Sequence, residues 1–290
     1  MKSSATIFIA AFIAVSGSWA GFVLAPQIQL GRTGQTKTVP AGKAYPVSRP
    51  GLAAQGAEVY RSLGCVYCHS QQVGQEGVEC EIILTDVGTN AMATLAALAS
   101  LDSTLARPET LAGLPKVIKT VANMGAADPI LKVIGAAGAK AEVVVRALGP
   151  DIERGWGLRR SVAQDYAYDH PVLPGVRRAG PDLANVGLRQ SDIAWQLCHL
   201  YAPASEVKGS TMPPYRFLFT QRKISSTPSA DALKLPPEFA PPAGYEIVPT
   251  DEAVALAAYL VSLRVDAPLF EAPFTAPAPP PTVATNSPAP

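Results

Sequence analysis

Two cysteines and a histidine form a motif whose chemistry follows directly from its spacing. Cys65, Cys68 and His69 stand as C-x-x-C-H. Two thiols at this spacing add across the two vinyl groups of a haem, and the histidine then lies under the iron as an axial ligand. A redox-active C-x-x-C pair and half of a zinc site are the alternatives, but a zinc site needs a second ligand pair and the sequence shows none. The motif therefore predicts one covalently attached haem c.

A second axial ligand decides what such a haem can do. An iron closed by His and Met transfers electrons at a raised potential, whereas an open sixth position binds oxygen, peroxide or gases. Of the four methionines, only Met212 lies outside the initiation site and the alanine-rich stretches. Two prolines follow it, and such a rigid loop can hold a thioether at a set distance. We expect Met212 to bind the iron, with His170 or His199 as the alternative if it does not.

Two expected helices must position these ligands. Apolar residues recur at helical spacing over residues 52–63, and Gly64 ends the run just before the motif. After the methionine loop, an acidic first turn at residues 250–252 begins a second apolar run that continues to Leu263. We expect the two helices to cross, with Gly56 allowing close approach.

A turn of sequence Gly180-Pro181-Asp182-Leu183 lies between the two ligands. It resembles an element of the small class I cytochromes c, in which the proline carbonyl accepts the free ring N–H of the proximal histidine and so fixes the ring. The resemblance implies that role for Pro181. Taken in order, the haem motif, the turn, the methionine loop and the closing helix resemble the mainly α class I cytochrome c fold.

The N-terminus predicts a membrane segment. Residues 3–30 carry no charge, and residues 6–25 are strongly apolar, which is about the length that spans the hydrocarbon core. We favour a retained anchor over residues 1–26; a cleaved signal peptide is the alternative. Because haem is attached covalently outside the bacterial inner membrane, the rest of the chain should be periplasmic, although three basic residues after the segment favour the opposite orientation.

Composition agrees with this layout. A chain of 290 residues allows about two domains, and a net charge of +1 argues against nucleic-acid binding. We expect a linker over residues 27–50 and a discontinuous cytochrome c domain over residues 51–73 and 151–266, called the outer segments below. Residues 267–290, rich in Pro and Ala, should form a disordered tail.

The motifs together resemble one family, the membrane-anchored mono-haem subunit (subunit II) of cbb3-type cytochrome c oxidases. The segments that carry the resemblance are Gly64-Cys65-Val66-Tyr67-Cys68-His69-Ser70-Gln71-Gln72-Val73, Arg154-Gly155-Trp156-Gly157, Arg178-Ala179-Gly180-Pro181-Asp182-Leu183, His199-Leu200-Tyr201 and Met212-Pro213-Pro214-Tyr215-Arg216-Phe217-Leu218. The resemblance implies a relay that passes single electrons from a di-haem cytochrome c subunit, or another cytochrome donor, to the haem-copper catalytic subunit. Such a subunit would activate no oxygen itself.

Residues 74–150, called the insert below, depart from that family's pattern. Their pattern predicts six elements in the order strand 80–85, helix 89–100, short helix 108–114, strand 116–121, helix 127–137 and strand 141–146. This order predicts a small α/β domain with its own core. The insert also resembles the C-terminal domain of the bacterial ribosomal stalk protein, but its first helix lacks the basic residues that recruit translation factors there. A docking or packing module and an inert spacer remain the two hypotheses.

Three further residues have open roles. Arg178 could bind a haem propionate, because arginine makes bidentate bonds to carboxylates. Cys80 and Cys198 could form a disulfide in an exported protein, but two small buried hydrophobic residues are the simpler interpretation.

Two other functions remain possible from the sequence. One is an anchored cytochrome c of another respiratory complex, of the nitric oxide reductase type. The other is a sensor or peroxidase with an open haem, which requires that Met212 not bind iron.

Overall fold

The computed structural model describes residues 2–29, 31, 34–38, 42–49 and 51–269. The chain divides into two compact units, residues 1–48 with 162–172 and residues 49–161 with 173–290. From residue 270 on, the tail predicted over residues 267–290 lies outside the described residues. At its start, Leu269 is buried and the Ala267 carbonyl accepts a hydrogen bond from Arg159.

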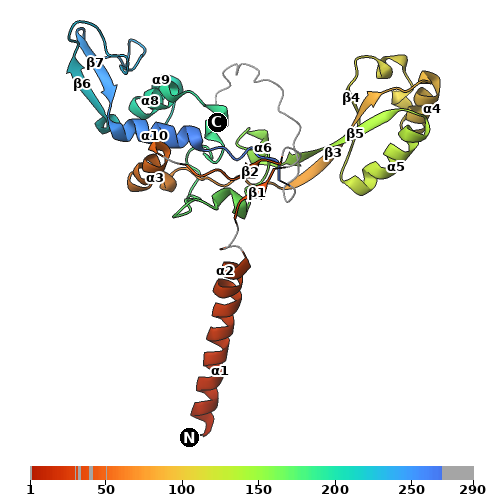
Figure 1. Ribbon diagram of the computed structural model, residues 1–290, viewed down its shortest axis with the longest axis horizontal. Coiled ribbons are helices and arrows are strands. Elements are labelled where there is room, and N and C mark those ends of the chain that lie inside the picture. Colours follow the sequence, from red (N-terminus) through yellow and green to blue (C-terminus); the bar gives the residue numbers. More distant parts are fainter. Residues whose placement is uncertain (1, 30, 32–33, 39–41, 50, 270–290) are drawn as a thin grey trace. The chain divides into compact units, whose positions relative to one another are not determined.

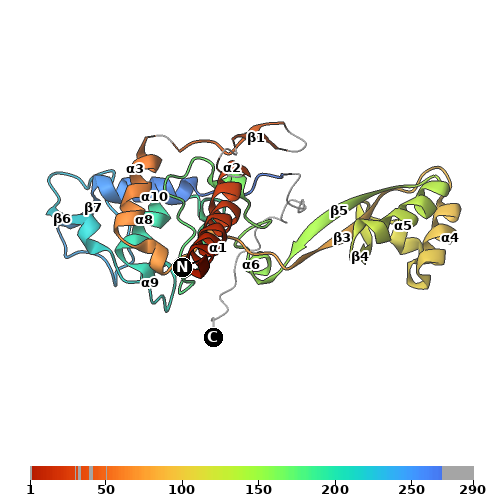
Figure 2. The ribbon, with the colours of Figure 1, turned by 90° about the horizontal axis from the view of Figure 1, so that it is seen from below.

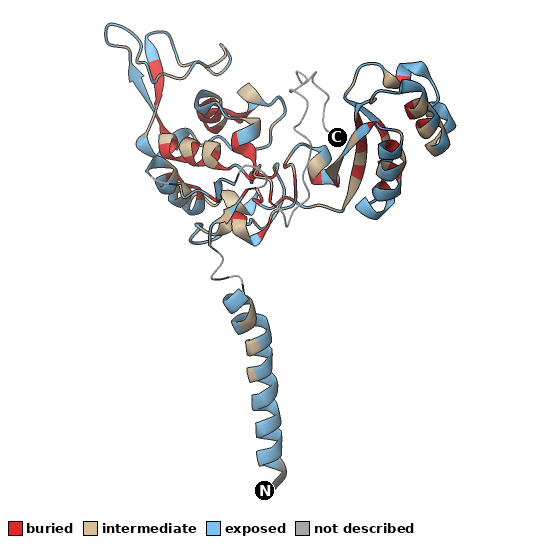
Figure 3. Cartoon of the chain, turned by 45° about the vertical axis from the view of Figure 1, so that its right-hand side comes forward, coloured by how far each residue is buried: buried red, intermediate tan, exposed pale blue. Residues whose placement is uncertain are grey.

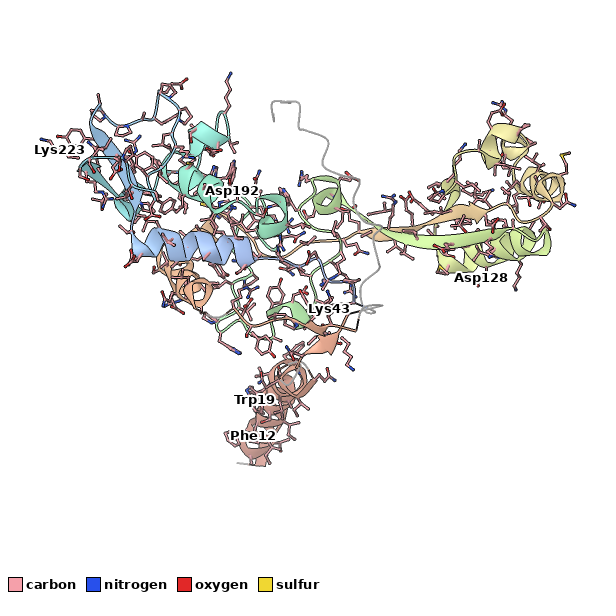
Figure 4. The ribbon with its side chains drawn as sticks, turned by 45° about the horizontal axis from the view of Figure 1, so that its top comes forward. Phe12, Trp19, Lys43, Asp128, Asp192 and Lys223 are labelled. Carbon is pink, nitrogen blue, oxygen red and sulfur yellow. The ribbon has the colours of Figure 1, made fainter. Side chains whose placement is uncertain are left out.

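An apolar helix begins the first unit (Figure 1). Helix α1, Lys2–Trp19, continues through a π-helical turn, η1, Ala20–Leu24, into α2, Ala25–Gln29. Residues 4–29 have a mean hydropathy of 2.1 over their most apolar stretch, and none of that stretch is buried. Phe12 and Trp19 project from the helix (Figure 4), which is exposed along nearly all its length (Figure 3). By length and composition, this helix is a candidate membrane anchor.

The rest of the first unit is small. Strands β1, Thr36–Lys37, and β2, Ala44–Tyr45, pair antiparallel within the predicted linker. The Tyr45 hydroxyl donates to Asp165 at 2.8 Å, next to the 3-10 turn η5, Ala163–Tyr166. Residues 30, 32–33, 39–41 and 50 of the linker lie outside the described residues.

Helices α3, Leu52–Ser62, and α10, Asp251–Ser262, pack closely in the second unit, and Figure 2 shows them crossing. A Cβ at Gly56 would overlap the Ala255 carbonyl, so the backbones meet at a position that only glycine fits. Thr250 caps α10 by accepting a hydrogen bond from Ala253 N. The two helices begin and end within about two residues of the expected positions.

Shorter elements complete the outer segments. The sequence predicted no strands there, but β6, Phe219–Lys223, and β7, Tyr245–Pro249, form an antiparallel hairpin. The remaining elements are η2, Cys65–Tyr67, α6, Pro150–Glu153, α7, Val186–Arg189, α8, Ile193–Tyr201, α9, Pro203–Glu206, and η6, Arg216–Leu218. One hydrophobic cluster joins α3, α8, α10 and the hairpin. Class I topology stays a prediction for this arrangement.

The insert contains the strands and the two longer helices expected from its sequence, whereas the short helix expected at residues 108–114 is a 3-10 turn ending at Leu111. Its elements are β3, Gly77–Asp86, α4, Ala91–Leu101, η3, Ser103–Leu105, η4, Pro108–Leu111, β4, Lys116–Val121, α5, Met124–Ala136, and β5, Lys140–Leu148. The sheet is antiparallel in the order β4-β3-β5. Ile82 and Leu84 point to one face of β3, where Leu98 of α4 and Ile134 of α5 cover them as a separate core. The exact boundaries of the insert and its likeness to the stalk protein stay predictions.

Cys80 and Cys198 are both buried, and both are free thiols. Cys80 lies on β3, whereas Cys198 lies on α8 with its sulfur 3.9 Å from the Lys234 carbonyl. The structure thus has them as two small buried residues rather than a disulfide.

Candidate functional site

The predicted ligands of both outer segments meet at one cavity of about 600 Å³. Cys65, Cys68 and His69 line it together with Met212 and Pro181. Most of its wall is apolar, with Tyr60 of α3, Leu183, Leu200 of α8, and Leu256 and Leu260 of α10 among the lining residues. A cavity of this size and character is typical of a small-molecule or cofactor site.

The backbone around the motif places the thiols and the imidazole together. Helix α3 ends at Ser62, and Gly64 then adopts a left-handed conformation with φ of 71°, which glycine adopts without strain. The turn that follows is closed by hydrogen bonds from Cys68 N and His69 N to Cys65 O, at 3.1 and 3.0 Å. Burial raises the pKa of the Cys65 thiol to about 11.

The His69 ring has a defined tautomer. Its Nδ1 lies 2.9 Å from the Pro181 carbonyl, and a carbonyl only accepts, so Nδ1 must carry the proton and Nε2 keeps its lone pair. Burial lowers the pKa of His69, and the Pro181 carbonyl opposes that shift only in part. A Cβ at Gly180 would overlap the His69 ring. The imidazole is therefore neutral and oriented as a metal ligand requires.

The loop with Met212 lies on the same cavity. Gly209 turns the chain with φ of 78°, and Tyr215 N bonds to Leu200 O at 2.8 Å, which ties the loop to α8. Met212 is partly buried and packs against the main hydrophobic cluster. Its thioether is thus held by the surrounding chain.

Cations of the cavity wall form a set that the sequence did not reveal. Among the described residues, the charged side chains that line the cavity are Arg154, Arg189 and Lys208, all basic. Arg189 donates from Nη2 to the Asp182 carbonyl at 2.5 Å, while its Nη1 is shielded from solvent and has no partner among the described residues. A buried guanidinium with a free donor calls for an anion. A haem with its two carboxylates meets that need, so the residues present fit such a group.

Arg178, the residue that the sequence suggested for a propionate, is not part of this wall. It donates from Nε to Ser70 Oγ at 2.9 Å and from Nη1 to Asp151 Oδ1 at 2.7 Å, and its Nη2 bonds to the Gln72 carbonyl. The propionate role of Arg178 stays a prediction. Arg189 is the arginine with a donor to spare at the cavity.

The two alternative histidines belong to different units. His199 lines the cavity and stacks on Trp195, with ring centroids 4.8 Å apart and an interplanar angle of 9°. Burial is the main cause that lowers the pKa of His199 to about 4. His170 belongs to the first unit and is not among the lining residues. His199 thus lines the same cavity as Met212, and the choice between them as a ligand stays a prediction.

Comparison with known proteins bears on this site. The family model of the cytochrome C oxidase, mono-heme subunit/FixO matches residues 141–236. This segment includes Pro181, Arg189 and Met212, and it ends before α10. A search of curated proteins finds no match. By that description, the family consists of mono-haem subunits of cytochrome c oxidase. The match agrees with the resemblance seen in the sequence: residues 141–236, about a third of the chain, are similar to the FixO family.

Proposed function

We propose that this chain is the membrane-anchored, mono-haem c-type cytochrome of a cbb3-type oxidase in aerobic respiration. It relays single electrons to the haem-copper catalytic subunit and receives them from a di-haem cytochrome c subunit or another cytochrome. The haem iron supplies the electron chemistry by taking up and releasing one electron. The chain itself holds the group, sets its ligands and shields it from water.

In this proposal each ligand has one task. Cys65 and Cys68 attach the haem covalently, and His69 binds the iron through Nε2. Met212 would supply a second iron ligand, which raises the reduction potential. Pro181 accepts the His69 ring N–H, and Arg189 binds a propionate.

The observation that carries the proposal is the meeting of both outer segments at one cavity. Cys65, Cys68 and His69 come before the insert and Met212 comes after it, yet all four line the same space. Neither the redox-pair nor the zinc interpretation of the motif gives a reason for a methionine loop and an apolar cavity at that place.

The location follows from the attachment chemistry. Covalent haem attachment takes place on the outer side of the bacterial inner membrane, so the haem domain should be periplasmic and α1 should cross the membrane once. The apolar helix at residues 4–29 has the required length and composition.

Two experiments on the full chain, purified from its native membrane, test the proposal. The denatured protein should keep its haem spectrum, and a haem-copper subunit should accompany it; absence of that subunit would contradict the oxidase assignment. Replacing Met212 with Ala should lower the reduction potential and open the iron to carbon monoxide. If the parent protein already binds carbon monoxide readily, the relay function fails. Met92→Ala, an exposed methionine of α4, is the matched control.

A further inference from the structure

A polar network with two buried carboxylates, Asp151 and Asp182, lies next to His69 in sequence and joins three stretches of chain that are distant in sequence; the Arg178 side chain at its centre is 38% exposed. Ser70 Oγ donates to Asp182 Oδ2 at 2.5 Å, and Arg178 Nε donates to Ser70 Oγ at 2.9 Å. Arg178 Nη1 bonds to Asp151, whose other oxygen accepts from Gly74 N at 2.6 Å. The network therefore connects the residue after His69 with both ends of the insert.

The carboxylates of this network are inaccessible to water. Asp182 is fully buried and Asp151 is about 4% exposed. Buried carboxylates require hydrogen-bond donors, since an unpaired one costs several kcal/mol. Asp182 already accepts from Ser70 Oγ, Gln72 N and Ala184 N. These three donors satisfy Asp182, and Arg178 adds a longer ion pair, with its Nη2 3.8 Å from Asp182 Oδ2.

The hydrogen bonds of Arg178 run to the chain that follows His69 and to Asp151. Nε and Nη2 bond to Ser70 and to the Gln72 carbonyl, and Nη1 bonds to Asp151. The guanidinium also lies over the Trp156 ring, 5.6 Å from its centroid. Three directed bonds and a stacked ring fix the guanidinium plane, as a lysine could not.

This fixed plane adjoins the contact that orients the proximal histidine. Leu183 N bonds to Ser70 O at 2.7 Å and Gly180 N to Cys68 O at 2.9 Å, so the turn with Pro181 runs along the motif on both sides of His69. The Pro181 carbonyl that meets His69 Nδ1 is the one next to Asp182. A shift of Ser70 against Asp182 would therefore move that carbonyl relative to the imidazole.

We propose that Arg178 is a positioning residue for His69. By holding Ser70, Gln72 and Asp151 in one plane, it keeps the Pro181 carbonyl in line with His69 Nδ1 although the insert interrupts the chain between Gly74 and Asp151. The inference rests on the proposed function, in which His69 binds the haem iron.

The test compares Arg178→Gln with Arg177→Gln, which removes the same charge from the exposed neighbouring residue, in the full haem-loaded chain. Arg178→Gln should weaken the His69 N–H bond to Pro181, make the imidazole a poorer electron donor and favour the ferrous state about tenfold. For a one-electron couple this raises the midpoint potential by about 59 mV. The g-values of the ferric low-spin haem should change with it.

Two further variants test the positioning role of Arg178. Arg178→Lys should recover only part of the shift, because it restores the charge without the planar set of donors. Ser70→Ala removes one hydroxyl and leaves the Arg178 to Asp151 pair in place, so it serves if Arg178→Gln fails to fold; we expect about a threefold shift in the same direction. Potentials and g-values equal to those of Arg177→Gln would overturn the inference. Failure of the proposed function would instead appear in the parent protein, as a chain without covalent haem or with an iron ligand other than His69.

Discussion

The outer segments and the insert bury their side chains in different ways. In the insert, the buried face of β3 is apolar, and α4 and α5 cover it with Leu98 and Ile134. In the outer segments, buried residues include the charged Asp151, Arg159 and Asp182, and the apolar cluster surrounds a cavity. The insert is thus held mainly by apolar packing of its two helices on one face of its sheet. The outer segments add directed hydrogen bonds and ion pairs between residues that are far apart in sequence. Matched changes in the two regions should therefore have different effects.

The cysteines offer the largest expected contrast. Replacing Cys65 and Cys68 together with Ala should abolish covalent haem, because no thiol remains to bond the vinyl groups. Cys80→Ala, in the insert, should keep all the haem and cost only about 1 kcal/mol from the lost packing. Haem staining of a denaturing gel measures both. Covalent haem in the double variant would refute the assignment of the motif.

Glycines in helices give the second contrast. Gly56→Ala should destabilise the outer segments by about 3 kcal/mol, because its methyl group would overlap the Ala255 carbonyl. Gly135→Ala, in α5, meets nothing within 4 Å and should stabilise the helix by up to about 1 kcal/mol. Denaturant unfolding followed by the haem spectrum and by circular dichroism separates the two. Equal effects at both positions would mean that α3 and α10 do not pack so closely.

Acid sensitivity should depend on His199. The pKa of His199 in the folded chain is about 4, below the ordinary value of 6.5. Between these pH values, His199 is therefore protonated in the unfolded chain and neutral in the folded chain. Stability should therefore fall by about 2 kcal/mol as the pH drops from 6.5 towards 4. His199→Gln should remove this part of the loss, as measured by denaturant unfolding at pH 7 and 4.5. Identical pH profiles for the parent protein and this variant would rule out a buried neutral His199.

Excision of the insert should have the smallest effect on the haem. Glu76 N bonds to Leu148 O at 2.9 Å, so a short Gly-Ser turn can replace residues 77–148. The haem spectrum and the reduction potential should stay unchanged, since Gly74 and Asp151 both remain. Loss of haem from this variant would show that the insert contributes to the site.

Local pattern predicted the insert well, because its strands and helices carry regular apolar spacing around one core. Asn90 caps α4 and Asn123 caps α5. Helix α5 therefore begins at Met124, three residues before the start that the apolar run predicted. The expected helix at residues 108–114 is only a 3-10 turn, η4, ending at Leu111. Such differences arise where a cap or a short turn, rather than apolar spacing, sets the boundary.

Residue type identified the candidate ligands, but long-range geometry decides their surroundings. Met212 was singled out from its two prolines, and it lines the cavity with Cys65 and His69. Arg189 was missed, because its exposure to the cavity depends on how α7 packs rather than on any motif. Arg178 was noticed for its charge, yet its partners lie on stretches that no spacing rule connects. Haem binding by these residues stays a prediction.

The pairing of Glu76 with Leu148 has a consequence for how the chain reaches its fold. His69 and Pro181 are 112 residues apart in sequence, and closing a loop that long costs entropy that grows with the logarithm of its length, about 0.6 kcal/mol for each doubling. Once the insert has folded, its two ends are already together, and the loop that remains is far shorter. If the insert folds first, it therefore removes part of the loop-closure entropy cost that its own length adds.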